Sequence, residues 1–383
     1  MMHRLLPTNY AENRLGARDE RVEPAEEATR CAGGHVRRTS ARAERCNTVS
    51  EPVELELAGK TVRVTSPDKV FFTKRGETKL DLIDYYTAVA EPMMAVVGGR
   101  PALMQRFPDG ASGKSFWQKR VPKGAPDWLE TTTVSTPNGT TSEAIVLADI
   151  AHVVWAAHMG SLCFHVWPYL AGQPEIADEL RIDLDPHGAI TFDDIGWAAH
   201  QVRAFFLELG MTSWVKTTGS KGLHVFVKLA PQWDSYKVRA AAVALARELE
   251  RRHPDRLTAA WWKEERGDRV FIDFNQNAPH KTVFGAWSVR PRVGAQVSMP
   301  ITWDAVDHVD PNGLTIATVP GLLDELGDAW SDYPAASQSL APLLEFHERD
   351  MAAGMMDAPW PPVYPKQPNE PPRVAPSRAK NPE

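Results

Sequence analysis

Cysteine is scarce in this chain of 383 residues, which contains only Cys31, Cys46 and Cys163. Three scattered cysteines are too few for a disulfide framework, and their scarcity indicates a reducing compartment. Cys31 and Cys46 lie on either side of His35, but this loose spacing within an Arg-rich segment is not typical of a metal site. The cysteines therefore predict neither a disulfide-stabilised nor a metal-stabilised fold.

Long apolar runs are also absent. No stretch of about 18 apolar residues occurs, and the N-terminus lacks the continuous apolar stretch of a signal peptide. Neither a membrane span nor secretion is indicated, so we expect a cytoplasmic protein with no membrane partner. The 43% of hydrophobic and 24% of charged residues are those of an ordinary globular protein.

The chain has no excess of positive charge. Its 43 Lys and Arg residues are outnumbered by 49 Asp and Glu residues, which gives a net charge of -6. A uniformly basic surface for nucleic acid is therefore excluded. Any contact with DNA must come from local clusters of basic side chains.

Composition divides the chain into three parts. Residues 1–50 mix Arg, Glu and Ala without apolar periodicity, which predicts a disordered or weakly helical extension. Residues 346–383 form a predicted Pro-rich tail, and from Pro359 onward the backbone should be extended and solvated because proline has no amide donor. Residues 51–345 are predicted to form one compact domain.

Short strand-like runs alternate with helical runs in the predicted domain, which indicates a mixed α/β fold. Thr78 and Asp81 resemble a capping box, so a helix should begin there and end near Pro92. Asp149 is the candidate cap of a helix over residues 150–158. The other predicted helices cover residues 192–209 and 235–252, and the predicted strands cover residues 101–107, 114–121, 142–147, 180–185, 213–217, 223–229 and 269–274.

Two carboxylates share one predicted strand within residues 181–186. Side chains alternate along a strand, so Asp183 and Asp185 should point to one face while Ile182 and Leu184 pack on the other. Carboxylates held this close repel each other unless a cation lies between them, and hard oxygen ligands suit Mg²⁺ or Mn²⁺. The alternative is a solvated turn, because Asp-x-Asp arises readily by chance.

A glycine-rich, basic segment follows at residues 217–224, with the sequence TTGSKGLH. Its glycines would let backbone amides approach an anion, and Lys221 and His224 would neutralise the charge. The spacing is not that of a Walker A loop, so an ordinary glycine hairpin is the alternative. We interpret the segment as a phosphate-binding loop.

Asp273 ends a third strand-like run, with Arg266 and Arg290 on either side of it in the sequence. Taken alone, Asp273 is a structural residue at a strand end and the arginines are solvated surface residues. Together with the Asp183 and Asp185 pair and the phosphate-binding loop, Asp273 would complete the set of residues that two-metal phosphoryl transfer requires. One cation would activate a 3′-hydroxyl, and the other would hold the triphosphate and stabilise the leaving pyrophosphate.

In these residues the sequence resembles the archaeo-eukaryotic primase superfamily, and within it the polymerase domain of the bacterial multifunctional ligases that repair double-strand breaks by end joining. The resemblance runs from about Ser66 to Trp330. No Lys-x-Asp-Gly adenylation motif occurs, so we expect a stand-alone polymerase module without a ligase domain. The matching motifs are Asp183-Leu184-Asp185, residues 218–224, Phe271-Ile272-Asp273 with Gln276 and Asn277, Asp68-Lys69-Val70 with Lys79, Arg106-Phe107-Pro108, Phe116-Trp117, the His165 segment, Arg266, and Ser288-Val289-Arg290.

The resemblance implies a primase-like fold and a role for each matching residue. The catalytic residues and ligands of two Mn²⁺ or Mg²⁺ ions would be Asp183, Asp185 and Asp273. Nucleotide binding is implied for His165, Thr218, Ser220, Lys221, His224, Arg266, Gln276 and Arg290. DNA binding is implied for Lys69, Lys79, Arg106, Phe116 and Trp117.

The DNA-binding residues have specific expected partners. The resemblance implies that Lys69 and Lys79 form a pocket for the 5′-phosphate at the downstream side of a gap, whereas the lysines taken alone are surface residues. It also implies that Phe116 and Trp117 stack on template bases, and the alternative for this pair is a place in the strand core.

Three positions depart from the family's pattern. Thr218 replaces the usual serine and keeps its hydroxyl, while Phe274 replaces a tryptophan and keeps its aromatic ring. The segment around His165 is less typical, so the role of His165 is less well supported than the roles of the aspartates.

We therefore predict a template-directed nucleotidyltransferase of the primase-polymerase type, which extends primers and fills short gaps with NTPs or dNTPs. The resemblance implies a preference for ribonucleotides and gapped or 5′-phosphorylated DNA as the partner, in a protein associated with the bacterial nucleoid. Whether Ku or a separate DNA ligase recruits it stays open. The alternatives are a primase that starts chains de novo, which needs a second nucleotide site, and a catalytically idle protein that binds DNA ends.

Overall fold

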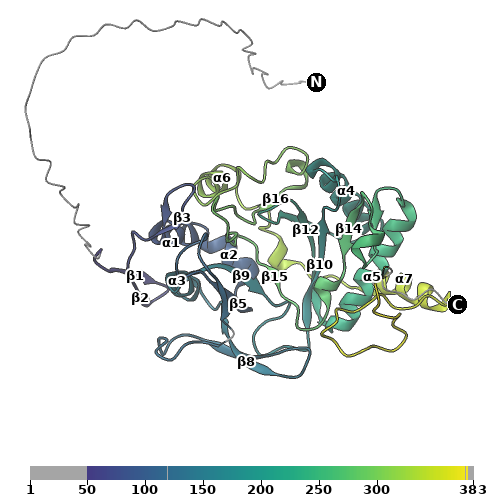
Figure 1. Cartoon of the computed structure of the whole chain (residues 1–383), viewed down its shortest axis with the longest axis horizontal. Helices are drawn as coiled ribbons and strands as arrows, with labels where there is room; N and C mark the ends of the chain where they lie inside the picture. The colour runs from purple at the N-terminus through teal and green to yellow at the C-terminus, as the bar shows by residue number, and fades with distance from the viewer. Residues whose placement is uncertain (1–49, 119, 376, 378–383) are drawn as a thin grey trace, which may run out of the picture. The chain divides into compact units, whose positions relative to one another are not determined.

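The computed structural model describes residues 50–118, 120–375 and 377. Almost all of the predicted N-terminal extension lies outside these residues, as do Cys31 and Cys46, so those predictions stay untested. The described residues form seven α-helices and two six-stranded sheets (Figure 1). The mixed α/β class predicted from the sequence is confirmed.

The first sheet, called the β10 sheet here, has the strand order β13-β14-β10-β12-β11-β16. All its neighbouring strands are antiparallel except the pair β13 and β14. Its strands are β13 (Leu257–Thr258), β14 (Val270–Asp273), β10 (Ala177–Asp185), β12 (Leu223–Trp233), β11 (Trp214–Thr217) and β16 (Pro300–Ile301).

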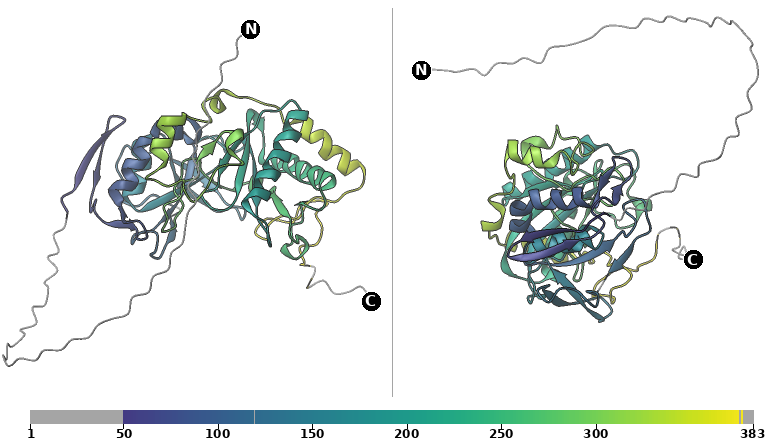
Figure 2. Two further views of the ribbon diagram at one scale, coloured as in Figure 1. Left: turned by 90° about the horizontal axis from the view of Figure 1, so that it is seen from above. Right: turned by 90° about the vertical axis from the view of Figure 1, so that its left-hand side faces the viewer.

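The second sheet, called the β5 sheet here, has the order β15-β9-β5-β8-β7, and β6 also pairs with β5. Its strands are β15 (Val283–Phe284), β9 (Ser161–Val166), β5 (Pro101–Arg106), β8 (Thr141–Val146), β7 (Thr131–Ser135) and β6 (Phe116–Gln118). Two hairpins precede or adjoin it, formed by β1 (Val53–Leu57) with β2 (Lys60–Val64) and by β3 (Val70–Phe72) with β4 (Glu77–Thr78). Figure 1 and the left view of Figure 2, both with the long axis horizontal, show the β1–β2 hairpin and α7 toward opposite ends of the described residues.

The helices begin where the sequence supplies capping side chains. The predicted capping box of Thr78 and Asp81 starts α1, and the Asp149 carboxylate accepts two backbone hydrogen bonds at the start of α3. Thr191 and Asp194 form a second capping box, which starts α4. The helices are α1 (Lys79–Ala88), α2 (Ala90–Val97), α3 (Ile150–His158), α4 (Phe192–Glu208), α5 (Ser235–Arg252), α6 (Val319–Leu326) and α7 (Ala341–Ala352).

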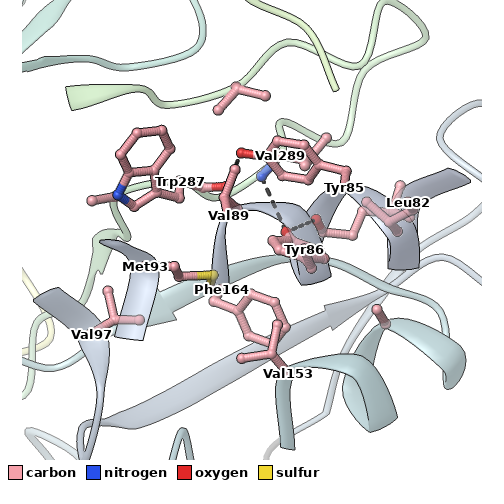
Figure 3. Packing of buried hydrophobic residues seen from close by; sticks show 14 of the residues in the cluster. Leu82, Tyr85, Tyr86, Val89, Met93, Val97, Val153, Phe164, Trp287 and Val289 are labelled. Carbon is pink, nitrogen blue, oxygen red and sulfur yellow. Dashed lines mark hydrogen bonds between the residues drawn. The ribbon is translucent and has the colours of Figure 1, made fainter. Parts of the chain in front are cut away.

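Each sheet has its own apolar core. Ile182 and Leu184 of β10 pack with apolar side chains of α4 and α5, as the predicted alternation requires. Helices α1, α2 and α3 pack with the β5 sheet in the other core (Figure 3). In that core the buried hydroxyl of Tyr85 donates to the carbonyl of Trp287 over 2.7 Å. The phenolic group is thereby satisfied without breaking the apolar packing.

The segment from Asp357 to Arg373, called the C-terminal strap here, departs from the predicted solvated tail. The side chains of Trp360 and Tyr364 are buried, with exposed fractions of 3% and 6%. The Glu370 carboxylate accepts hydrogen bonds from the backbone amides of Trp360 and Gln367. The expectation of solvated backbone is therefore wrong here, because proline lacks an amide donor but keeps a carbonyl that other groups can satisfy.

Helix α7 crosses the predicted boundary between residues 345 and 346, and the domain limits stay a prediction.

No helix among the described residues is long and apolar enough to cross a bilayer.

Candidate active site

A row of polar side chains crosses the β10 sheet on the face opposite its helices. Strand register places Asp183 directly opposite Asp273 of β14 on one side and His224 of β12 on the other. His224 in turn lies opposite Lys216 of β11. Because directly paired residues of adjacent strands point to the same face, four strands align these side chains without any loop.

The three predicted aspartates converge at one end of this row. Ligand oxygens of Asp183, Asp185 and Asp273 lie within 4.8 Å of one another. The Asp183 side chain is 15% exposed, and its Oδ1 lies 3.2 Å from Nε2 of His224 without accepting a hydrogen bond. Three convergent carboxylates with a bare oxygen are the donor set that hard divalent cations take, so the site fits Mg²⁺ or Mn²⁺.

The aspartates are poorly compensated by positive charge. Burial raises the pKa of Asp183 to about 6, against the opposing attraction of Arg290 and Lys216. Burial and the neighbouring Asp183 raise the pKa of Asp185 to about 6 and that of Asp273 to about 7. The cluster therefore favours either protons or a bound cation near neutral pH.

Asp273 is held from the turn that follows it, η2 (Asn275–Asn277). The backbone amide of Asn275 donates to Asp273 Oδ1 over 2.8 Å, and Gln276 Nε2 donates to Oδ2 over 2.9 Å. Gln276 thus orients a carboxylate, while its predicted contact with the nucleotide stays a prediction.

A cavity of about 450 Å³ opens beside the aspartates. It unites eight of the residues predicted from the sequence, namely Asp183, Asp185, Thr218, Ser220, Lys221, His224, Arg266 and Arg290. It also includes Lys263, which begins a short 3-10 helix, and His187, which lies in a loop; neither was predicted, because neither belongs to a recognisable sequence motif. A pocket with carboxylates at one side and several cations elsewhere suits a polyanion carrying divalent cations.

The predicted phosphate loop joins β11 to β12. The Thr218 hydroxyl accepts hydrogen bonds from the amides of Ser220 and Gly222, each over 3.2 Å, which folds the loop back on itself. Gly219 has φ +67°, and a Cβ there would lie 2.8 Å from Cγ of Arg290. Glycine is required at this position both by conformation and by the close approach of Arg290.

Two arginines of the cavity are held by carbonyls and aromatic rings. Arg290 Nε donates to the Thr218 carbonyl, and its guanidinium stacks on Phe284 at 3.9 Å. Arg266 donates to the carbonyls of residues 260 and 261 and stacks on Phe271 at 3.4 Å. Neither guanidinium is neutralised by an ion pair within the described residues, so both charges remain available to a ligand.

Lys216 is a buried lysine that was not predicted from the sequence. Its side chain is fully buried, and Nζ donates to Ser298 Oγ over 2.6 Å. Burial and the charge of Arg290 lower its pKa well below the usual value. The sequence did contain one indication of this position, because Lys216 alternates with the apolar Val215 in a strand next to the phosphate loop.

His165 lies outside the cavity, on β9 of the β5 sheet. Its ring makes edge contacts with Trp117 and with Phe284, each with centroids 5.2 Å apart. Burial, followed by the charges of Arg290 and Lys216, lowers its pKa to about 4. His165 is therefore neutral at physiological pH and lies between the predicted base-stacking pair and the cavity's cations.

The predicted phosphate lysines are neighbours: Lys69 directly precedes β3, Lys79 begins α1, and the amide of Lys79 donates to the carbonyl of Lys69 over 2.8 Å. Lys79 is buried, its Nζ donates to the Thr65 carbonyl over 2.6 Å, and burial together with the charge of Lys69 lowers its pKa. Lys69 is more exposed and pairs with Asp109 over 3.1 Å. The surface-lysine alternative is thus wrong for Lys79, which lies too deep to be simply solvated.

The predicted stacking pair lies on the short strand β6. Phe116 and Trp117 are 47% and 46% exposed, so the strand-core alternative is wrong for both. The Arg106 guanidinium lies 5.4 Å from the Phe116 ring and donates to Gln118 Oε1 over 2.7 Å. Two adjacent exposed rings beside a cation form a surface on which bases can stack.

Comparison with known proteins agrees with this architecture. The family described as the LigD primase-polymerase domain matches residues 78–330. The multifunctional non-homologous end joining protein LigD of Mycolicibacterium smegmatis is 35% identical over 269 residues, which are 70% of this chain and 35% of that protein. The bifunctional LigD of Bacillus subtilis is 29% identical over 286 residues, 74% of this chain and 45% of that protein.

Among solved structures, the polymerase domain of Mycobacterium tuberculosis ligase D in complex with DNA superposes with a TM-score of 0.68 at 31% identity. The match covers 72% of this chain and 99% of that domain. The chain thus spans less than half the length of the two curated relatives but nearly the whole of a solved polymerase domain.

Proposed function

The chain belongs to the LigD primase-polymerase domain family, and on this premise we propose that it is a DNA-directed nucleotidyltransferase that extends primers and fills short gaps during end joining. The observation that carries the proposal is that two members of the three-aspartate cluster, Asp183 and Asp185, line one cavity together with Lys221, Arg266 and Arg290. The carboxylates suit divalent cations and the basic side chains suit a triphosphate, so both requirements of nucleotidyl transfer lie together.

Asp183, Asp185 and Asp273 would hold two Mn²⁺ or Mg²⁺ ions. When bound, the cations supply the charge that activates a 3′-hydroxyl and stabilises the leaving pyrophosphate. The side chains of Lys221, Arg266 and Arg290 bind the phosphate oxygens. Rigid strands and carbonyl-anchored guanidinium groups orient the nucleotide before reaction, which lowers the entropic cost of reaching the transition state.

We assign the sugar of the incoming nucleotide to the neighbourhood of His165, and ribonucleotides are the preferred substrates. The neutral imidazole offers one donor and one acceptor, which suit a hydroxyl group. The family resemblance supports the ribonucleotide preference.

On the DNA side, Lys69 and Lys79 bind the 5′-phosphate of the downstream strand, while Phe116 and Trp117 stack on template bases. Burial and then the charge of Lys69 lower the pKa of Lys79, and a bound phosphate dianion would compensate the charges of both lysines. The partners are gapped or 5′-phosphorylated DNA together with NTPs or dNTPs. Recruitment by Ku and a separate ligase belongs to the proposal, since the named relatives act in non-homologous end joining.

The test is extension of a gapped duplex with a downstream 5′-phosphate, measured for the wild type and for Asp183→Asn. Loss of a metal ligand removes several kcal/mol of transition-state stabilisation, so we expect extension to fall about 1,000-fold. Asp307→Asn is the matched control, because Asp307 is 58% exposed and belongs neither to the three-aspartate cluster nor to the lining of the cavity, and this variant should extend normally. Equal extension by wild type and Asp183→Asn would contradict the metal assignment.

The same assay with a downstream 5′-phosphate or 5′-hydroxyl tests the DNA contacts. We expect Lys69→Ala to weaken binding to the phosphorylated gap about tenfold, the value of one charge-assisted contact, and to leave binding to the hydroxyl gap unchanged. Lys366→Ala, at an exposed position of the strap, is the control. Efficient product formation on an unprimed template would instead identify a primase.

A further inference from the structure

The C-terminal strap contacts the turn that orients Asp273. The carbonyl of Pro359 accepts a hydrogen bond from Asn275 Nδ2 over 3.1 Å, and the Tyr364 hydroxyl donates to the carbonyl of Pro279. The strap therefore contacts both the first residue of η2 and the segment directly after its last residue. It lies beyond residue 330, where the match to the family ends.

Arg239 of α5 connects the strap with η2. Its side chain is 1% exposed, and Nε donates to Asn275 Oδ1 over 2.7 Å. Nη1 donates to Asp357 Oδ1 over 3.1 Å, and Nη2 donates to the carbonyl of Ala358 over 2.9 Å. The indole of Trp360 covers the guanidinium at 3.9 Å, and its Nε1 donates to Asp357 Oδ2 over 2.7 Å.

These contacts form a continuous chain that ends at a carboxylate of the candidate metal site. The strap fixes Arg239, Arg239 fixes the side chain of Asn275, and the amide of Asn275 donates to Asp273 Oδ1. Asp273 needs such a support because it ends a strand of only four residues and is repelled by Asp183. A free carboxylate in this position would rotate away from its acidic neighbours.

We propose that the strap, through Arg239 and Asn275, is a positioning element that holds Asp273 in the orientation needed for metal binding. The inference rests on the metal-binding role in the proposed function. Groups that orient metal ligands without touching the metal typically change metal affinity or activity by about 10–100-fold when they are removed.

Mn²⁺ binding to the full chain, measured by electron paramagnetic resonance without DNA or nucleotide, tests this role. Trp360→Ala uncovers Arg239 and releases Asp357, so we expect affinity for Mn²⁺ to fall about tenfold. Trp360→Phe keeps an aromatic ring over Arg239 and should retain most of the affinity. Val363→Ala is the matched control, because Val363 lies on the strap but is 67% exposed.

Folding is checked by thermal unfolding of each metal-free variant. If Trp360→Ala does not fold, Asn275→Ala replaces it, since that change removes only the side-chain link and keeps the backbone amide that binds Asp273. Wild-type affinity in whichever of these two variants is folded would overturn the inference. An equal loss of affinity in Val363→Ala would overturn it as well.

The outcome is separable from that of the proposed function. Asp273→Asn should abolish the tight Mn²⁺ site. A wild-type chain that binds Mn²⁺ through this site but does not extend primers would overturn the proposed function and leave the strap's role intact. A wild-type chain that binds no Mn²⁺ would overturn the strap's role.

Discussion

Strand β10 carries charged side chains in both of its halves, and the two halves differ in how those charges are compensated. In the first half, Asp178 and Glu179 both contact the buried guanidinium of Arg100, and Glu179 also pairs with Arg181. The cations hold the pKa of both carboxyls below their usual values despite burial. In the second half, burial raises the pKa of Asp183 and Asp185 to about 6.

The difference separates a structural charge cluster from a ligand site. The Tyr333 hydroxyl also donates to Glu179, so the first cluster is satisfied internally and ties the two sheets together. In the second half, neither Asp183 nor Asp185 pairs with a lysine or arginine of the described residues, and both line a cavity. The negative charges of Asp183 and Asp185 are thus left for a bound cation to compensate.

Removing one partner of the first cluster should have the largest effect on stability. Glu179→Gln leaves Arg100 and Arg181 with one carboxylate fewer in a buried environment, so we expect a loss of about 3–5 kcal/mol in the free energy of unfolding. Urea denaturation at neutral pH measures it. A loss below about 1 kcal/mol would show that the two halves of β10 do not differ in the way described.

In the second half of β10, removing a charge should raise the free energy of unfolding. Asp183→Asn mimics the protonated carboxyl, so it should stabilise the metal-free protein at pH 7.5. A pKa difference of about two units corresponds to roughly 3 kcal/mol, and we expect about 2 kcal/mol because the cleft admits water. The same denaturation assay in a chelator measures the change. Destabilisation by Asp183→Asn would mean that its carboxylate is compensated after all.

The pH dependence of stability sharpens the comparison further. In the folded protein, the pKa values of Asp183, Asp185 and Asp273 lie above the unfolded value of about 4. Their contribution to the free energy of unfolding is therefore complete below pH 4 and is lost as the pH rises through 6 to 7. We expect the metal-free wild type to lose about 1–2 kcal/mol more than Asp183→Asn between pH 5 and pH 8.

Glu179 should behave in the opposite way, because its folded pKa is lowered. Its contribution is present above pH 4.5 and lost as pH falls below that value, so Glu179→Gln should flatten the acid limb alone. Unfolding curves at several pH values check both limbs. Identical pH profiles for the two variants would contradict the assignment.

The smallest effect is expected at the edge of the first cluster. Lys228 pairs with Asp178 over 2.6 Å but remains 18% exposed, and Asp178 keeps Arg100 as a second partner. Lys228→Met should therefore cost about 1 kcal/mol, measured by the same denaturation. A cost equal to that of Glu179→Gln would place Lys228 within the buried cluster and not at its edge.

Much of this arrangement could be predicted from sequence because local rules govern it. The capping box of Thr78 and Asp81 and the alternation around Asp183 gave the correct helix start and the correct strand faces. Lys216, Lys263 and His187 escaped notice, since their place beside the aspartates depends on strand register and loop folding. The prediction of a solvated tail was wrong. Composition shows that prolines lack amide donors, but it does not show which groups hydrogen-bond to their carbonyls in the fold.

The sequence by itself determined the elements and the order of the motifs, because turn, cap and alternation signals act over a few residues. Only the tertiary structure decided which charges neutralise one another. Asp178 and Asp183 are five positions apart in one strand, and the local sequence does not record which cations lie near each of them. Arg100, which directly precedes β5 of the other sheet, contacts the first, whereas Asp273 adds further negative charge beside the second. Electrostatic energy depends on distance in space, which the chain order does not record.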